Sequence, residues 1–499
     1  MLQYVFIFAF KITNMDRSNI IGRKRELEML ERLYSSDKSE FLAIYGRRRV
    51  GKSYLVDEFF SKEMAFSIVG TFKKCENGEE VLYKRLQLKH FYRSLLDYGL
   101  DSSYKEPADW IDAFDLLKKL LAGKGSGRKV IFFDELPWLA GPKSSELIEE
   151  LGYFWNSWAV KQRDIFLIVC GSATSWMLDN VIRDYGGLHG RLTEKIYLAP
   201  FDLAESRLYY SAKGFRMSDY EVAMSYMAIG GIPYYMDRLR PDRTLSQNIN
   251  DFYFKNSSID QEFRDVYTGL FQSADRYMDI VKALGAKFYG MTRNELIAAT
   301  SLKGGGTFTR ILDNLQECGI VRSFSRYGGK RKETIYQLCD FFTLFYLNFV
   351  GAKEQRKDWI YFQRTHEYEN WSGRTFELLC SRHIAQIKDS LRIKSMAQDY
   401  CWKGDNPEGG RVQVDMVIPS PEERTDYLCE MKFSENRYVI TADYEKNLLD
   451  KLDAFRLSKN HKPSHSLLLV MVTTMGLGNA SHNRIVNAEV TLDDLFREL

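Results

Sequence analysis

The stretch EFLAIYGRRRVGKSYLVDEFF, residues 40–60, reads as an apolar strand, a glycine-rich loop and the start of a helix. The loop has the pattern GxxxxGKS from Gly46 to Ser53. In this setting, backbone N–H groups wrap phosphates, Lys52 reaches the outer phosphates and the Ser53 hydroxyl binds Mg²⁺. We therefore predict a P-loop for ATP, and the alternative is a basic loop that caps a helix. The predicted binding residues are Gly46, Arg47, Arg48, Arg49, Val50, Gly51, Lys52, Ser53 and Tyr54.

Two further apolar stretches end in polar residues. RKVIFFDELPWL, residues 128–139, ends its apolar run at Asp134 and Glu135. The first carboxylate would complete the Mg²⁺ shell, and the second would polarise the attacking water. After the strand DIFLIVCGSA, Ser172 could sense the terminal phosphate or could simply cap a helix. Arg191 could reach a phosphate in cis or across a subunit contact, or it could be a surface arginine.

The order of these motifs resembles a known group of ATPases. The motifs are IIGRKREL (20–27), GRRRVGKS (46–53), FFDELPWL (132–139), CGSA (170–173), HGRL (189–192) and GGIPYYM (230–236). Over roughly residues 18–250, the chain resembles the archaeal-type ATPases of the AAA+/STAND group. The resemblance implies an ASCE-type parallel sheet, a helical lid after about residue 200, and adenine contacts from Ile21, Gly22 and the turn from Gly231 to Pro233. We therefore expect an ATPase domain with a helical lid over residues 15–250.

A winged helix is predicted for residues 265–350. Three helical patterns are followed by SRYGGKRKETIYQL, a hairpin-like wing with Gly328 at its turn and basic residues 330–332 beside it. This architecture can place a helix in a DNA groove, but it also serves protein contacts. The third helix carries few basic residues, chiefly Arg310, so the wing is the better candidate for DNA contact. The apolar segment 336–350 is expected to be a buried connector helix.

The C-terminal part, residues 351–499, reads as helix, three strands, helix and strand, with the first strand near SLRIKSM, residues 390–396. This αβββαβ order resembles the restriction-endonuclease-like PD-(D/E)XK superfamily. The motif is present as Asp415, Glu430 and Lys432, with Glu377 on the preceding helix, whereas Val414 stands in place of the proline. The resemblance implies a Mg²⁺-dependent nuclease domain.

Phosphodiester hydrolysis explains why these residue types occur together. An Mg²⁺ ion held by Asp415, Glu430, Glu377 and the Met431 carbonyl would neutralise transition-state charge and activate a water. Lys432 would orient or deprotonate that water. The alternative is a structural Glu430–Lys432 pair, which would leave Asp415 and Glu377 unexplained.

Composition constrains these hypotheses only weakly. The chain has 499 residues, 45% of them apolar, and a net charge of +3, which gives no global argument for nucleic acid. Seven cysteines without CxxC pairs and the lack of a roughly 20-residue apolar run predict a cytoplasmic protein without membrane spans. Residues 1–14 could be an over-extended reading frame or an added segment. Homo-oligomer formation stays open.

Two functions account for the predicted domains. The first is an ATP-hydrolysing protein that acts on DNA through a C-terminal nuclease gated by nucleotide state. The second is a STAND-type nucleotide switch or DNA-binding regulator whose C-terminal domain is non-catalytic.

Overall fold

The computed structural model divides the described chain into two compact units. The described residues are 19–71, 80–141, 146–182, 188, 190–271, 273–329, 333–351, 358–394, 399–406, 408–479 and 481–499. The first unit comprises residues up to 45, 51–171 and 176–197, and the second comprises 46–50, 172–175 and 198–499. Residues 1–14 lie outside the described residues. The predicted domain boundaries at 250, 265 and 351 stay predictions.

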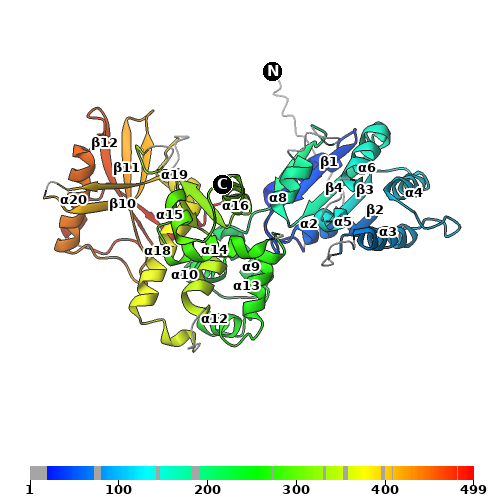
Figure 1. Cartoon of the computed structure of the whole chain (residues 1–499). Helices are drawn as coiled ribbons and strands as arrows, with labels where there is room; N and C mark the ends of the chain where they lie inside the picture. The colour runs from blue at the N-terminus through cyan, green and yellow to red at the C-terminus, as the bar shows by residue number, and fades with distance from the viewer. Residues whose placement is uncertain are drawn as a thin grey trace, which may run out of the picture. The chain divides into compact units, whose positions relative to one another are not determined.

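The first unit contains a five-stranded sheet. Its strands are β1 (Glu40–Tyr45), β2 (Met64–Val69), β3 (Lys129–Asp134), β4 (Ile165–Gly171) and β5 (Glu194–Tyr197). They lie in the order β2-β3-β4-β1-β5, and every neighbouring pair is parallel (Figure 1). Parallel strands need long crossover connections, which helices supply here. The parallel sheet predicted for a P-loop fold is confirmed, and β4 lies between the strands that carry the two motifs.

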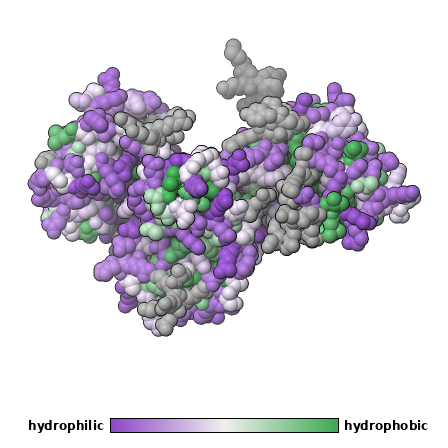
Figure 2. Space-filling view, in the orientation of Figure 1, coloured by the Kyte–Doolittle hydropathy of each residue, from purple (hydrophilic) through white to green (hydrophobic). Residues whose placement is uncertain are grey.

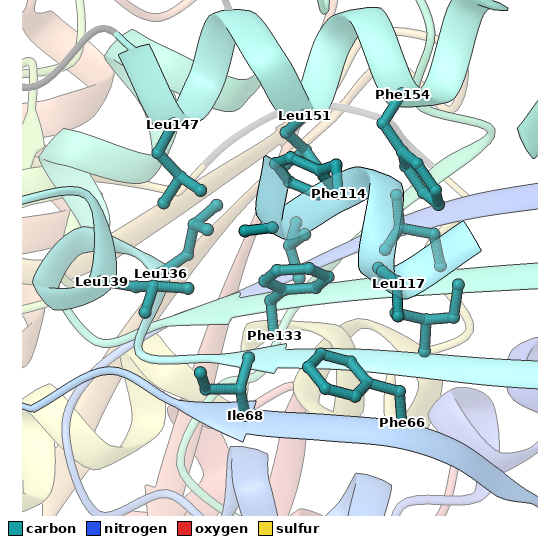
Figure 3. Packing of buried hydrophobic residues seen from close by; sticks show 14 of the residues in the cluster. Phe66, Ile68, Phe114, Leu117, Phe133, Leu136, Leu139, Leu147, Leu151 and Phe154 are labelled. Carbon is teal, nitrogen blue, oxygen red and sulfur yellow. The ribbon is translucent and has the colours of Figure 1, made fainter. Parts of the chain in front are cut away.

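Helices and helical turns precede or connect these strands. They are α1 (Lys24–Tyr34), α2 (Lys52–Phe59), α3 (Glu80–Asp97), α4 (Trp110–Ala122), α5 (Leu136–Ala140), α6 (Glu146–Phe154), η1 (Trp155–Ala159), α7 (Val160–Gln162), α8 (Thr174–Met177) and η2 (Leu178–Ile182). Figure 3 shows Phe133 of β3 between Phe66 of β2 and Phe114 of α4. The ring of Phe133 is fully buried, and its centroid lies 6.0 Å from that of Phe66 and 6.1 Å from that of Phe114. This aromatic core fixes β3, and with it the position of Asp134 at the strand end.

The second unit begins with helices that follow the sheet. They are α9 (Leu203–Ala212), α10 (Asp219–Ile229), α11 (Pro233–Met236), α12 (Leu245–Tyr253) and α13 (Ile259–Thr268). Three of them start at capping boxes. In each, the side chain of Asp202, Ser218 or Thr244 accepts a backbone N–H three residues later, and the glutamate or glutamine at that later position accepts the N–H of the capping residue. Helices are therefore present where the lid was predicted, and they belong to the second compact unit.

A small α/β segment follows in the same unit. Its elements are α14 (Ala274–Ala286), β6 (Met291–Thr292), α15 (Arg293–Ala299), α16 (Gly306–Glu317), β7 (Val321–Phe324) and β8 (Ile335–Leu338). The strands form an antiparallel sheet in the order β6-β8-β7. Three helices and this sheet occur in the order expected for a winged helix, which stays a prediction. The basic residues 330–332 lie outside the described residues, and Arg310 is exposed on α16.

The expected connector helix over 336–350 is wrong in its first part. Residues up to Leu338 belong to β8, because Tyr336 pairs with Met291 of β6 and Ser323 of β7 and completes the small sheet. A strand's hydrogen bonds to two neighbours outweigh the helical appearance of an apolar run. The helix α17 (Phe341–Phe345) and the π-helical turn η4 (Tyr346–Val350) then form a buried connector, as predicted.

The C-terminal sheet has the strand order β13-β12-β11-β10-β9. The elements are η5 (Trp359–Tyr361), α18 (His366–Arg382), α19 (Ile384–Ser390), β9 (Tyr400–Asp405), β10 (Arg411–Ser420), β11 (Thr425–Lys432), α20 (Ala442–Leu457), β12 (Ser466–Thr473), η6 (Ser481–Ile485), β13 (Ala488–Thr491) and α21 (Leu492–Leu495). Strands β9, β10 and β11 pair antiparallel, and β11, β12 and β13 pair parallel. Helix α18 packs against β11, and α20 packs against β10. The expected element order is present, and β13 and α21 extend it, but among the described residues the first strand is not near residues 390–396: α19 continues to Ser390, and the strand is β9 at Tyr400–Asp405.

The visible surface carries mainly hydrophilic residues, with hydrophobic ones scattered among them (Figure 2). Among the described residues, no helix is both long and apolar enough to cross a membrane. The six described cysteines are free thiols.

Candidate functional site

The loop between β1 and α2 depends on two glycines. Gly46 has φ +144°, and a Cβ atom there would lie 2.5 Å from the Leu198 carbonyl oxygen. Gly51 has φ +92° and is the residue that precedes α2. Side chains are disfavoured at both positions, so glycine lets the backbone form the loop. Lys52 begins α2 with a buried side chain, as the P-loop motif requires.

Two predicted magnesium ligands are in contact in the first unit. The Ser53 hydroxyl donates a hydrogen bond to Oδ2 of Asp134 at 2.6 Å, and Asp134 is buried at the end of β3. Its other oxygen, Oδ1, accepts the Glu135 backbone N–H at 2.9 Å. Burial, and then the charge of Asp134, raise the pKa of Asp57. A hydroxyl and a carboxylate at a helix N-terminus are ligands that Mg²⁺ favours, so these residues fit the ion.

Glu135, the predicted base for ATP hydrolysis, has an uncommon backbone. Its φ of 46° and ψ of 48° lie in the left-handed region, where non-glycine residues are rare. Such a conformation costs on the order of 1–3 kcal/mol and clusters at functional sites. It starts α5 directly after β3, so the side chain leaves the strand end beside Asp134. The catalytic role of Glu135 stays a prediction.

The other predicted nucleotide contacts stay predictions. In the first unit, Ile21 and Gly22 precede α1, Arg191 is exposed in a turn, and the Tyr54 hydroxyl donates to the Asn19 carbonyl at 3.0 Å. In the second unit, the buried Ser172 accepts a hydrogen bond at its carbonyl from the Thr174 hydroxyl at 3.4 Å, and Pro233 is the first residue of α11.

The three P-loop arginines belong to the second unit and bind acidic or carbonyl groups of that same unit. Arg47 forms a buried ion pair with Asp340, the N-cap of α17. Arg49 pairs with Glu262 of α13, and its guanidinium lies 4.2 Å from the Tyr234 ring centroid. Arg48 donates to the Asp265 carbonyl at 3.5 Å. These side chains bind protein, so phosphate contacts at positions 47–49 would come from backbone N–H groups.

In the C-terminal sheet, Asp415 lies at an irregularity of β10. The pairing with β9 shifts register between Val414 and Val417, and such bulges re-aim side chains. Oδ2 of Asp415 accepts the Met431 backbone N–H from β11 at 3.0 Å. Asp415 is thereby held next to the Glu430–Lys432 segment, as the sequence predicts.

The Glu430 carboxylate is buried and faces α20. Its Oε2 accepts hydrogen bonds from Lys451 at 2.6 Å and from the Tyr444 hydroxyl at 3.2 Å. Its Oε1 is buried and, within the described part of the chain, has no hydrogen-bond partner. The ammonium of Lys432 lies 4.6 Å from the Tyr444 ring centroid, so both motif residues meet the same helix.

Electrostatic effects connect Glu377 to the motif. Burial, followed by the charges of Asp415 and Glu430, raises the pKa of Glu377 to about 8. Burial and Asp415 also raise the pKa of Glu430, and Lys451 and Lys432 oppose that rise. However, the described residues contain no group of three or more His, Cys, Asp or Glu side chains that could hold a metal ion. The metal site therefore stays a prediction, although the unsatisfied Oε1 of Glu430 fits a cation.

Comparison with known proteins assigns the front of the chain. Residues 20–239 match the family model described as an ATPase domain predominantly from Archaea. Over these residues the chain is similar to an archaeal-type ATPase domain. The match supports ATP binding and hydrolysis, and it contains the Ser53–Asp134 contact and Glu135.

Two relatives of known sequence come from Methanocaldococcus jannaschii. Uncharacterized protein MJECL04 is 27% identical over 430 residues, which cover 83% of this chain and 88% of that protein. Uncharacterized ATP-binding protein MJ0423 is 44% identical over 43 residues, which cover 9% of this chain and 73% of that protein. The first of these is similar to this chain well beyond the ATPase domain.

Two solved structures are similar at a more distant level. The Walker-type ATPase PABY2304 of Pyrococcus abyssi has a TM-score of 0.48 at 20% identity, over 67% of this chain and 97% of that one. The Aeropyrum pernix ORC2 protein has a TM-score of 0.41 at 16% identity, over 66% of this chain and 94% of that one. At these scores, neither likeness supports an inference of function.

Several residues of both sites were missed by the sequence interpretation. For the ATPase domain, these are Asp340 and Glu262, which bind the P-loop arginines. For the acidic site, they are Tyr444 and Lys451, which share one face of α20 with the buried Leu448. The spacing of 444, 448 and 451 was a usable signal for this face, because residues three and four apart are neighbours on a helix.

Proposed function

We propose that this protein is an ATP-hydrolysing enzyme that acts on DNA, and that its C-terminal domain is a Mg²⁺-dependent nuclease controlled by nucleotide state. The ATPase domain supports the first part. The observation that carries the second is the buried, unsatisfied Oε1 of Glu430 beside Asp415, within the described residues. A buried carboxylate oxygen without a partner is costly, and a divalent cation would satisfy it.

In the ATPase domain, the protein residues have separate roles. Lys52 binds the outer phosphates, and Ser53 and Asp134 hold the magnesium ion that accompanies ATP. Glu135 accepts a proton from the attacking water, and its strained backbone fixes the carboxylate at the end of β3. Glu135→Gln should retain ATP binding and lower the hydrolysis rate by about 10²–10⁴-fold.

In the C-terminal domain, Asp415, Glu430 and Glu377 would hold a divalent cation, which would supply charge neutralisation at a phosphodiester. Lys432 orients the water, and Tyr444 holds the Lys432 ammonium near the acids through a cation–π contact at 4.6 Å. Lys451 balances the charge of Glu430. The small α/β segment that precedes this domain is proposed to be a winged helix.

Two observations favour a second function, a nucleotide switch with a non-catalytic C-terminal domain. In the described residues, no three acidic or histidine side chains are arranged to hold an ion, and Lys451 already neutralises Glu430. This alternative predicts ATP binding that depends on Lys52 and no cation binding by the C-terminal domain.

One experiment separates the two functions. Purified protein is incubated with plasmid, linear duplex and single-stranded DNA in Mg²⁺ or Mn²⁺, with and without ATP. The nuclease proposal expects cleavage by the wild type, loss of cleavage in Asp415→Asn, and retention in Asp453→Asn, whose carboxylate is exposed and pairs with Arg456. Cleavage that is equal in Asp415→Asn and wild type, or absent from both, would reject the nuclease. Different cleavage in Glu135→Gln would indicate control by hydrolysis.

A further inference from the structure

A cavity of about 200 Å³ adjoins the acidic site within the second unit. One wall comes from the small α/β segment and includes Tyr289, Arg322 and Arg326. The opposite wall comes from α18, β9 and β10 and includes Glu377, Lys403 and Asp415. Pockets for drug-sized ligands are roughly 300–1,000 Å³, so this cavity has room for a smaller group only.

Tyr289 presents an aromatic ring to this cavity. Its side chain is 39% exposed, and its ring centroid lies 5.5 Å from the Arg374 guanidinium and 5.5 Å from the Lys403 ammonium. Burial, and then the charge of Glu377, raise the pKa of its hydroxyl; Asp415 adds to that rise. The ring therefore lies near both acids and is flanked by two cations.

The two cavity walls are attached to each other through the hairpin after β7. Arg326 forms a parallel bridge with Cys401 of β9, and the Tyr327 N–H donates to the Cys401 carbonyl at 3.0 Å. The Tyr327 ring stacks on Phe455 of α20, with centroids 6.0 Å apart and planes at 18°. A Cβ atom at Gly328 would lie 1.7 Å from Asn460. This side of the hairpin makes a protein contact, one of the two roles predicted for the wing.

These contacts limit what can approach the acids from the cavity side. A double helix keeps its bases paired and would need the walls to separate. A single strand needs an aromatic surface for a base and cations for its phosphates. Tyr289 supplies the surface, and the exposed Lys403 and Arg326 supply the cations.

We propose that this cavity binds one unpaired base of a single-stranded nucleic acid, stacked on Tyr289, with the adjoining phosphates outside it near the exposed Lys403 and Arg326. The inference rests on the proposed function, because it names the form of nucleic acid that the C-terminal domain accepts. Tyr289 is then a specificity-determining residue contributed by the preceding segment. Stacking on an aromatic side chain corresponds to about 5- to 150-fold in affinity per base.

The test is binding by the full-length protein without divalent metal, so that no cleavage is needed. Fluorescent oligo-dT and oligo-rU are compared with a hairpin duplex of equal length by anisotropy in EDTA. We expect tighter binding of the single strands, about 5- to 150-fold weaker binding by Tyr289→Ala, and near wild-type binding by Tyr289→Phe. Tyr361→Ala, which removes a tyrosine that is 67% exposed on η5, is the matched control.

Two charge variants extend the test. Lys403→Gln and Arg326→Gln should each lower the salt dependence of single-strand binding by about one phosphate contact. Equal binding of duplex and single strand, no binding of either, or an unchanged affinity in Tyr289→Ala would overturn the inference. Circular dichroism shows whether each variant folds. If Tyr289→Ala does not fold, Tyr289→Phe decides the question, because it keeps the aromatic ring and must therefore still bind the single strands.

The outcomes distinguish this inference from the proposed nuclease. If single-strand binding depends on Tyr289 but no cleavage occurs in Mg²⁺, the proposed base-binding site stands and the nuclease is rejected. Cleavage of duplex that is insensitive to Tyr289→Ala would leave the nuclease and reject the site.

Discussion

Removing the charge of Asp340 should release residues 46–50 of the P-loop from helix α17, to which Arg47 attaches them within the second unit. The Arg47–Asp340 pair is buried, with 3% and 6% of the two side chains exposed. Breaking a buried pair by removing one partner costs about 3–5 kcal/mol, because the remaining charge is left uncompensated. Asp340→Asn is the sharp change, since asparagine can still accept the Thr343 N–H that Asp340 Oδ2 accepts at 3.0 Å as the N-cap of α17.

The cost of breaking the Arg47–Asp340 ion pair can be separated from the loss of the α17 N-cap and from the loss of an exposed ion pair. Asp340→Ala should cost about 1 kcal/mol more than Asp340→Asn, because it also removes the cap. Asp242→Asn is the control, since Asp242 pairs with Arg240 at 2.8 Å while both side chains are 60% exposed. Exposed pairs contribute about 0–1 kcal/mol. In the double variant Arg47→Met/Asp340→Asn, both charges are gone and stability should return to within about 1 kcal/mol of wild type.

The assay is hydrogen exchange with peptide-level mass spectrometry, because a chain with two compact units does not guarantee two-state unfolding. Peptides that cover residues 46–50 and α17 should exchange about 10²–10⁴-fold faster in Asp340→Asn. ATP affinity should fall in parallel, since the loop that is proposed to bind the phosphates is no longer anchored. Exchange in Asp340→Asn that equals exchange in Asp242→Asn would refute the reasoning.

Three further changes test other parts of the chain. His383 is buried; its Nε2 accepts the Leu203 N–H at 3.2 Å, and burial lowers its pKa to about 4. In the unfolded chain the histidine pKa is about 6.5, so as pH falls the unfolded state binds the extra proton first. The free energy of unfolding should therefore fall by up to about 1.4 kcal/mol per pH unit between about pH 6.5 and pH 4. Urea unfolding midpoints measured across this range should not show that pH dependence in His383→Gln. Lys451→Met should destabilise the metal-free protein by about 3–5 kcal/mol, because the buried Glu430 loses its ion-pair partner. Lys446→Met, on the exposed face of α20, is the control and should not destabilise it. In thermal melts, Mg²⁺ should restore the stability of Lys451→Met, and no effect of Mg²⁺ would argue against the cation site. In Gly231→Ala, the new Cβ would lie 2.1 Å from the Phe201 carbonyl oxygen. We expect the free energy of unfolding to fall by about 1–3 kcal/mol and ATP binding to weaken. Gly373→Ala is the control, because a Cβ at Gly373 would meet no atom within 4 Å.

The P-loop and the strand ends could be predicted from sequence because their signals are local. Glycine spacing, an apolar run and a following helix are all contained within residues 40–60. The strand that ends at Asp134 is identified in the same way, and parallel strands bring such ends to one edge of a sheet. The contact between Ser53 and Asp134 follows from these local features, although 81 residues separate them.

Where sequence interpretation was wrong or incomplete, the reason lies in partners from distant elements. Tyr336 looked helical because the apolar run continues into α17, but β6 and β7 provide hydrogen bonds that favour a strand. Asp415 was predicted near Glu430 because a hairpin joins β10 and β11. The partners of Glu430 on α20 were not predicted, since lysine and tyrosine on a helix are usually solvent-facing.

The partners of the P-loop arginines show most clearly what sequence cannot supply. Asp340 is 293 residues from Arg47, and it is one of 67 acidic residues in the chain. Only the tertiary structure selects it. The selection bears on nucleotide control, because a ligand shifts a conformational equilibrium only when it binds the two states differently. If residues 47–49 bind phosphates through their N–H groups, as proposed, the phosphate contacts and the side-chain contacts with α13 and α17 lie on one short segment. If ATP changes the backbone at residues 47–49, it must also change these ion pairs, and their variants should alter the ATP dependence of any C-terminal activity.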